Sequence, residues 1–307
     1  MSLHAMGFVN RKNCDIPEWF PEFNAFFINK YLANHFNVNL IEFADNEYWR
    51  AVNYPHDYKA HINTITYVHP KSSKAIIFTT YYNTGEVFKY SKGIIDNYDT
   101  VIYSGHYNPK LLEAEWPGDP NIITPWLFRP LRWEEPEYNY TPKHDRLYFR
   151  GLTNEWFRRE VNFLEQTKHK EIDVVSGRSK NYDQECCESK ICLSLQGVRD
   201  MCNRDIELWS RGIPSIRPRF TCKLAVDIPE DIYIPIDFEY QDTPIGRVPA
   251  NPEAFAKNIV STYFNVKDDD KLLQQISNNS REFYLQNFTP SKIAEFTLNK
   301  ILAHFDV

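Results

Sequence analysis

Short apolar runs alternate with longer mixed segments along the first half of the chain. Four of these runs have the length of a strand: Asn39–Ala44, Ala75–Tyr81, Thr100–Ser104 and Asn121–Pro125. The segments between them have helical or turn patterns, and an aromatic helical segment over residues 16–36 precedes the first run. Strands that alternate with helices are typical of a parallel sheet with crossover connections. The first half therefore predicts an α/β lobe.

The same alternation continues more regularly in the second half. Predicted strands cover residues 146–149, 171–176, 191–195 and 213–216, and helical patterns separate them. A second sheet with helices between its strands follows from this order. The second half therefore predicts another α/β lobe, which we expect to be Rossmann-like.

Helix ends are visible among these elements. Thr153 or Asn154 can begin a helix after the first strand of the second half. Asn203 can be the N-cap of another helix, Arg204–Arg211, which Gly212 ends. Two amphipathic helical patterns close the chain, and the last of them begins at Pro290, a residue that suits the first position of a helix.

The segment between the two halves is rich in proline and charge, which is typical of an interdomain connection. We place the connection at residues 125–143, an N-terminal lobe at 1–124 and a C-terminal lobe at 144–289. A chain of 307 residues is long enough for two domains of this size. Ligands of two such lobes facing a cleft would bind at the carboxyl ends of the strands.

Composition and charge exclude several classes of protein. The net charge is −6, which argues against a general nucleic-acid binder because such a protein needs a basic face. We see neither an apolar run of membrane-spanning length nor a secretion signal, so we expect a cytoplasmic protein without a transmembrane segment. The six cysteines match no zinc-binding spacing and are expected to be reduced thiols.

Glycine and basic residues follow three predicted strands of the second half. A glycine lets a phosphate approach the backbone, while a helix N-terminus or an arginine attracts the anion. Glu207 follows Arg204 by three residues near the start of one predicted helix, and its carboxylate could accept the hydroxyls of a ribose. The candidate residues for binding a ligand with a ribose and a diphosphate are Arg150, Gly151, Arg158, Gly177, Arg178, Gln196, Gly197, Arg204 and Glu207.

A plainer interpretation exists for each of these residues. The arginines could lie in solvated surface turns, and Arg204 with Glu207 could form an intrahelical ion pair that contributes only about 0.2–0.5 kcal/mol. The two interpretations differ in where the arginines lie. Convergence of Arg150, Arg158, Arg178 and Arg204 on one site indicates a diphosphate, whereas scattered positions favour a non-catalytic module.

Three stretches together resemble the exostosin-like glycosyltransferases and other transferases of the B-type fold. They are RLYFRGLTNEWFRREV at 146–161, SKICLSLQGVRDMCNRDIELWSRGIPSIRP at 189–218 and NNSREFYLQNFTPSKIAEFTLNKIL at 278–302. The resemblance covers roughly residues 145 to 307 and implies two Rossmann-like lobes facing a cleft, with the C-terminal helix, 290–307, crossing back to the N-terminal lobe. It also implies that Glu207 binds the donor ribose, and Arg204 and Arg158 the diphosphate of a UDP- or GDP-sugar.

The resemblance leaves the stereochemistry and the catalytic base to be assigned. Retaining members of the class often have a glutamate eight residues before the ribose carboxylate, and this chain has Arg199 there, which favours inversion. An inverting transfer needs a base to deprotonate the acceptor hydroxyl. Asp45 and His106 follow predicted strands of the N-terminal lobe and are our candidates for this base. Asp268–Asp270 is interpreted as a helix start, so we expect neither a metal site nor another cofactor.

The sequence therefore predicts a metal-independent glycosyltransferase that transfers a sugar to a glycan or another hydroxyl acceptor. The alternative is a non-catalytic module on the same fold that binds a glycan or a protein. A third and weaker possibility is another nucleotide-sugar enzyme, such as an epimerase, which would need a carboxylate or histidine pair in the cleft.

Overall fold

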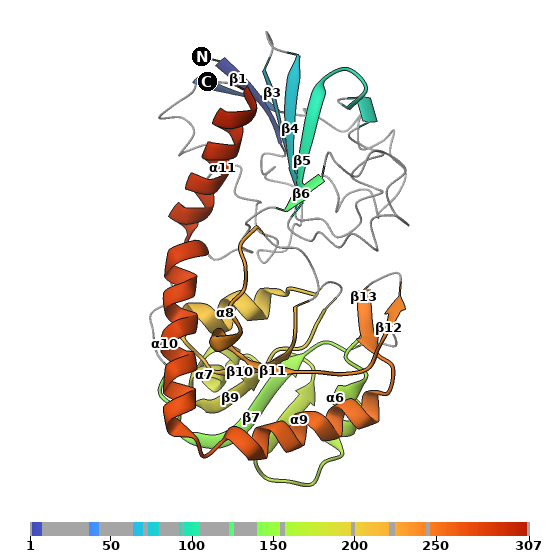
Figure 1. The fold of residues 1–307 in the computed structure, drawn as a ribbon, viewed down its shortest axis with the longest axis vertical. Helices are drawn as coiled ribbons and strands as arrows, with labels where there is room; N and C mark the ends of the chain where they lie inside the picture. The colour runs from blue at the N-terminus through green and yellow to red at the C-terminus, as the bar shows by residue number, and fades with distance from the viewer. Residues whose placement is uncertain are drawn as a thin grey trace. The chain divides into compact units, whose positions relative to one another are not determined.

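The computed structural model describes residues 2–7, 37–42, 64–69, 73–79, 92–93, 95–104, 123–125, 140–153, 157–197, 200–220, 225–243 and 246–305. The chain divides into two compact units, each with its own main sheet (Figure 1). The first unit comprises Met1–Trp133, Lys223–Val226 and Pro290–Val307. The second comprises Glu134–Cys222 and Asp227–Thr289.

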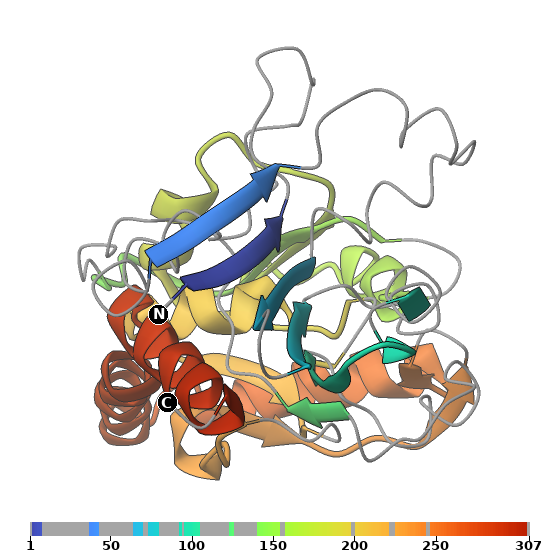
Figure 2. The same ribbon diagram turned by 90° about the horizontal axis from the view of Figure 1, so that it is seen from above.

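The sheet of the first unit has the order β2-β1-β3-β4-β5-β6 among the described residues. Neighbours β1 and β2 lie side by side and run parallel (Figure 2), as do β4 with β5 and β5 with β6. Strand β3 runs antiparallel to both β1 and β4. The bounds are β1 Ser2–Gly7, β2 Asn37–Glu42, β3 Thr64–His69, β4 Lys74–Thr79, β5 Asp99–Ser104 and β6 Ile123–Pro125.

The prediction of a wholly parallel sheet is therefore wrong for this unit. The four predicted strands are present, but β1 and β3 were not predicted. Only four residues, 70–73, connect β3 to β4, and Ser73 has a left-handed φ of 52°. A connection of this length allows a hairpin, whereas a parallel crossover needs a dozen residues or more.

The core of the first unit lies on β4 and β5. Ala75, Ile76, Ile77 and Phe78 are completely buried, and the Phe78 ring stacks on the ring of Tyr103 with centroids 5.1 Å apart. The last helix, α11 (Pro290–Phe305), belongs to this unit. The Lys74 ammonium on β4 donates to a carbonyl in the last turn of α11, that of His304, at 3.0 Å.

The second unit has a sheet whose described strands are all parallel, in the order β11-β10-β9-β7-β8. This is a Rossmann-like arrangement of the flavodoxin-like order, with helices between the strands. The sequence predicted the first four strands but neither β11 nor the hairpin of β12 and β13. The bounds are β7 His144–Gly151, β8 Ile172–Ser176, β9 Ser189–Leu193, β10 Ser215–Pro218, β11 Ile234–Ile236, β12 Tyr240–Thr243 and β13 Gly246–Pro249.

Helices cover both faces of this sheet (Figure 1). On one face, Leu147 and Phe149 of β7 pack with side chains of α6 and α9. On the other face, Tyr148 of the same strand packs with side chains of α7 and α8. Burial on both faces explains why the centre of β7, Leu147 to Phe149, is a continuous apolar run. The helices are α6 Glu160–Glu165, α7 Tyr182–Cys187, α8 Asn203–Arg211, α9 Pro252–Val266 and α10 Asp270–Asn287, with a 3₁₀ turn at Glu230–Ile232.

Two predicted helix starts are wrong. Helix α6 begins at Glu160 rather than after Thr153, because the Thr153 hydroxyl hydrogen-bonds to that of Ser176 at 2.7 Å and Arg158 adopts a left-handed φ of 61°. Helix α8 has Cys202, not Asn203, as its N-cap.

Two other helix ends agree with the sequence. Gly212 ends α8 in the left-handed conformation, with a φ of 63°. The acidic run Asp268–Asp270 is a helix start, as predicted, because the Asp269 carboxylate accepts the Leu272 amide at 2.9 Å.

None of the helices in the described part of the chain has both the length and the hydropathy needed to span a bilayer.

Candidate functional site

The order of the strands creates a topological switch point between β7 and β9. These two strands are neighbours in the sheet, yet β8 lies between them in the chain and pairs with the other edge of β7. Connections therefore leave the two strands in opposite directions, and in open α/β sheets the carboxyl ends of such strands are where ligands bind. Gly151 ends β7 at this point, and Ser194 to Gly197 continue from β9.

Gly151 lies against two guanidinium groups. A Cβ atom on this residue would lie 3.1 Å from Nη2 of Arg204, 3.2 Å from Nη1 of Arg158 and 2.9 Å from Cζ of Phe149. Side chains do not tolerate contacts this close, so only glycine fits without displacing its neighbours. The second glycine, Gly197, is near the same group, since its Cβ would lie 3.5 Å from Nη2 of Arg158.

Arg158 is held by backbone carbonyls around the switch point. Its Nε donates to Gln196 at 3.0 Å, its Nη2 to Leu195 at 3.2 Å and its Nη1 to Leu152 at 3.2 Å. Its left-handed φ of 61° is a conformation that costs a non-glycine residue about 1–3 kcal/mol. Burial, together with the charge of Arg204, lowers the pKa of the Arg158 guanidinium.

Arg204 lies in the first turn of α8 and is held from three sides. Its Nε donates to the hydroxyl of Tyr182 at 2.9 Å, and its Nη2 donates to the carbonyl of Arg150. The guanidinium carbon lies 4.2 Å from the centroid of the Phe149 ring. Its Nη1 is buried and has no hydrogen-bond partner among the residues that the structure describes.

These two arginines differ from their neighbours in charge compensation. The side chain of Arg150 forms an ion pair with Asp173 at 2.6 Å, and Arg211 pairs with Asp183 at 3.3 Å. Within the described residues, Arg158 and Arg204 have only neutral acceptors and no carboxylate partner. Two uncompensated positive charges therefore flank Gly151, and this arrangement suits an anion.

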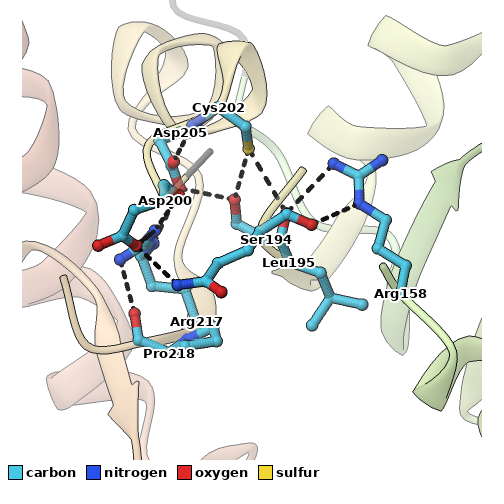
Figure 3. A network of polar contacts seen from close by, with 9 residues as sticks. Arg158, Ser194, Leu195, Asp200, Cys202, Asp205, Arg217 and Pro218 are labelled. Atoms are coloured by element: carbon cyan, nitrogen blue, oxygen red, sulfur yellow. Dashed lines mark hydrogen bonds and ion pairs between the residues drawn. The ribbon is translucent and has the colours of Figure 1, made fainter. Parts of the chain in front are cut away.

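A buried network holds the two segments that form this edge of the site (Figure 3). The Asp205 carboxylate, 1% exposed, accepts from Ser194 Oγ at 2.6 Å, from Arg217 Nε at 3.0 Å and from the Cys202 amide at 2.8 Å. Arg217 is completely buried and also donates to the Asp200 carbonyl at 2.9 Å. The ion pairs of Arg217 with Asp200 and Asp205, together with the hydrogen bond from Ser194 to Asp205, thus join β10, the segment after β9 and the start of α8.

The structure brings only part of the predicted donor set together. Gly151, Arg158, Gly197 and Arg204 converge, and Gln196 contributes its carbonyl. Glu207 lies one turn beyond Arg204 on α8 and forms no ion pair with it, so the plainer interpretation of that pair does not apply within the described residues.

The remaining predicted residues lie differently. Arg150 directs its side chain to Asp173 and contributes only its carbonyl to the Arg204 environment. Gly177 has a φ of 128° and donates its amide to the Gly151 carbonyl at 3.1 Å, while Arg178 is exposed. Asp45 and His106 lie outside the described residues.

Several residues of this region were not predicted from the sequence: Tyr182, Glu160, Cys202, Asp205 and Arg217. The Glu160 side chain is buried near Arg158, and its Oε2 has no hydrogen-bond partner in the described part of the chain. Burial raises the pKa of Glu160 to about 7. Arg217 lies within the buried strand β10, and its charge was a signal of a buried ion pair, since a buried arginine needs a partner. The other residues had no such signal.

Among the described residues, no group of three or more histidine, cysteine or acidic side chains is placed to bind a metal ion.

Comparison with known proteins gives a match only at the level of structure. No family profile and no curated protein matches the chain. The chain is similar to the crystal structure of a glycosyltransferase from Rickettsia africae ESF-5, with 12% identity, a TM-score of 0.50 and coverage of 90% of this chain and 87% of that chain. At this identity the similarity shows a shared fold.

The structure of a GtfA/B complex also matches, with 11% identity and a TM-score of 0.35, over 72% of this chain and 55% of that chain. This TM-score is too low to support an argument. The resemblance to exostosin-like enzymes stays a prediction.

Proposed function

We propose that the chain is a glycosyltransferase that binds a nucleotide-diphosphate sugar, such as a UDP- or GDP-sugar, in its second unit. The observation on which this proposal rests is the pair of guanidinium groups of Arg158 and Arg204. Both lie beside Gly151 at the switch point of a parallel sheet, and neither has a carboxylate partner among the described residues. The shared fold with a glycosyltransferase from Rickettsia africae supports the same proposal.

The diphosphate of the donor fits the chemistry of this site. In our proposal Arg158 and Arg204 bind its oxygens, and the backbone at Gly151 and Gly197 approaches it closely because no side chain intervenes. The first amides of α8 add partial positive charge. As the glycosidic bond to the diphosphate breaks, negative charge develops on the leaving group, and the same groups stabilise that charge.

Glu207 is our proposed ligand for the donor ribose. Its carboxylate lies on α8, one turn after Arg204, and forms no hydrogen bond or ion pair with a described residue. A carboxylate in this state keeps all its acceptor capacity for hydroxyl groups. We propose an inverting, metal-independent transfer to a glycan or another hydroxyl acceptor, with Asp45 or His106 as the base that deprotonates the acceptor.

The decisive experiment is a binding screen followed by two variants. Thermal unfolding is measured with UDP, GDP and their sugar derivatives, and a ligand at 100 times its dissociation constant should stabilise the chain by about 2.7 kcal/mol. Calorimetry then compares Arg158→Met with Arg159→Met. The adjacent Arg159 is the matched control, because it directs Nη2 to the Pro249 carbonyl instead, at 3.4 Å.

We expect Arg158→Met to weaken binding about tenfold to a hundredfold, because it removes hydrogen bonds from a charged donor, and Arg159→Met to leave it nearly unchanged. Absence of stabilisation by every nucleotide tested would refute the proposal. Tight binding without release of UDP or GDP in the presence of glycan acceptors would support the non-catalytic module instead.

A further inference from the structure

We propose that Tyr182 is a positioning residue that fixes the Arg204 guanidinium in the orientation required to bind the diphosphate of the donor. This inference rests on the function proposed above. It adds a residue to the site that belongs to neither of the two switch-point strands, since Tyr182 is the first residue of α7.

Tyr182 determines the orientation of Arg204 through a single hydrogen bond. The phenolic oxygen accepts Nε of Arg204 at 2.9 Å, and the guanidinium carbon lies 5.4 Å from the centroid of the Tyr182 ring. With Nε bound to α7 and Nη2 bound to the Arg150 carbonyl of β7, the planar group cannot rotate without losing one of these bonds. The remaining nitrogen, Nη1, has no acceptor among the described residues, and an anion bound to this guanidinium would satisfy it.

A phenol holds the arginine without neutralising it. Burial raises the pKa of Tyr182 well above its ordinary value, so the side chain stays uncharged. Arg150 illustrates the alternative, because its side chain forms an ion pair with the Asp173 carboxylate, which it shares with Arg146. The positive charge of Arg204 is thus left for a ligand. A neutral acceptor at this position is the arrangement expected for an arginine that binds an anion.

The neighbouring Tyr148 provides a matched control. The two rings are 6.4 Å apart between centroids, and both side chains lie between β7 and α7. The Tyr148 hydroxyl donates to Glu185, and its ring lies under Arg146 and Arg150. Removing this hydroxyl therefore deletes a phenolic group from the same aromatic pair without changing the hydrogen bonds of Arg204.

The test is a double-mutant cycle on binding of UDP and of GDP, measured by calorimetry. The proteins are the wild type, Tyr182→Phe, Arg204→Met, the double variant and Tyr148→Phe, with circular dichroism and thermal unfolding as checks of the fold. We expect Tyr182→Phe to weaken binding about tenfold, because Nε of Arg204 loses its acceptor while the ring is retained. In the Arg204→Met background the same change should have no further effect, and Tyr148→Phe should bind like the wild type.

Three results would overturn the inference. Equal affinity of Tyr182→Phe and the wild type, with Arg204→Met weakened, would refute it and leave the proposed function intact. A loss on Tyr182→Phe that persists in full in the Arg204→Met background would show that Tyr182 does not act through Arg204. Absence of binding by the wild-type chain would refute both this inference and the proposed function.

Discussion

Arg158 and Arg204 direct guanidinium nitrogens to within 3.2 Å and 3.1 Å of the same point, the place where a Cβ atom on Gly151 would lie. The two residues come from different elements, one preceding α6 and the other in the first turn of α8. Like charges held together without a carboxylate partner destabilise a fold. Binding of an anion would explain this arrangement, whereas the stability of the fold does not explain it.

The space at Gly151 gives a steric test of the site. An alanine there would contact both guanidinium groups and the Phe149 ring, so Gly151→Ala should displace the arginines and weaken binding of UDP or GDP by about tenfold or more. Gly93→Ala, outside the proposed site, is the control, since a Cβ on this residue would have no atom within 4 Å. Calorimetry on the two variants checks the difference. Similar affinities for both would contradict the geometry.

Glu160 should make stability depend on pH. Burial raises its pKa from 4.5 to about 7, so the folded chain binds more protons than the unfolded chain between these values. The contribution of Glu160 to the free energy of unfolding should therefore be highest below pH 4.5, fall as the pH rises to 7, and stay lower by about 3 kcal/mol above it.

The variant Glu160→Gln, which cannot ionise, isolates this contribution. The two proteins should have similar stability at low pH, and the variant should be the more stable above pH 7. Urea unfolding at a series of pH values gives the difference curve. A difference that does not change with pH would rule out the assignment to Glu160.

The buried pair of Asp205 and Arg217 should contribute strongly to folding. Asp205→Asn removes the nearer of the two carboxylates that face the completely buried Arg217, and loss of one partner of a buried pair costs about 3–5 kcal/mol. The exposed pair of Glu253 and Lys257 on α9 is the comparison, and Glu253→Gln should cost less than about 1 kcal/mol. Chemical unfolding measures both. Equal losses of unfolding free energy in the two variants would mean that the buried pair contributes no more to folding than the exposed pair.

Glu207 should affect binding of the nucleoside part of the donor. Glu207→Gln keeps the size of the side chain but loses its charge, and we expect UDP and GDP to bind about tenfold more weakly because hydrogen bonds to a charged acceptor are the stronger ones. Binding of inorganic pyrophosphate, which has no ribose, should not change. An equal loss for pyrophosphate and the nucleotides, measured by calorimetry, would place the effect elsewhere.

The proposed base acts on turnover rather than on donor affinity. Of Asp45→Asn and His106→Ala, the variant that removes the base should reduce the rate of transfer by about a hundredfold or more, because general-base catalysis contributes at least that much. Its affinity for the donor nucleotide should stay that of the wild type. Nucleotide release with a glycan acceptor measures the rate. Full activity in both variants would exclude both residues.

Local patterns were sufficient for much of the second unit. Apolar runs bounded by turn residues predicted β7 to β10, and Gly212 marked the end of α8 because its left-handed φ of 63° suits glycine. The first unit was less predictable. Strand β3 joins β4 through four residues and reverses the local direction of the sheet, and such pairing is set by connection length rather than by apolar content.

The sequence by itself determined the parallel sheet of the second unit and the positions of Gly151, Arg158 and Arg204, since strands, glycines and arginines can be recognised one at a time. Tertiary structure alone decided which arginines have a carboxylate partner. Asp173 on a neighbouring strand forms ion pairs with Arg150 and Arg146, whereas Tyr182 holds Arg204 with a neutral hydroxyl. Partners of this kind come from other elements, and only the packing of those elements against the sheet brings them within hydrogen-bonding distance.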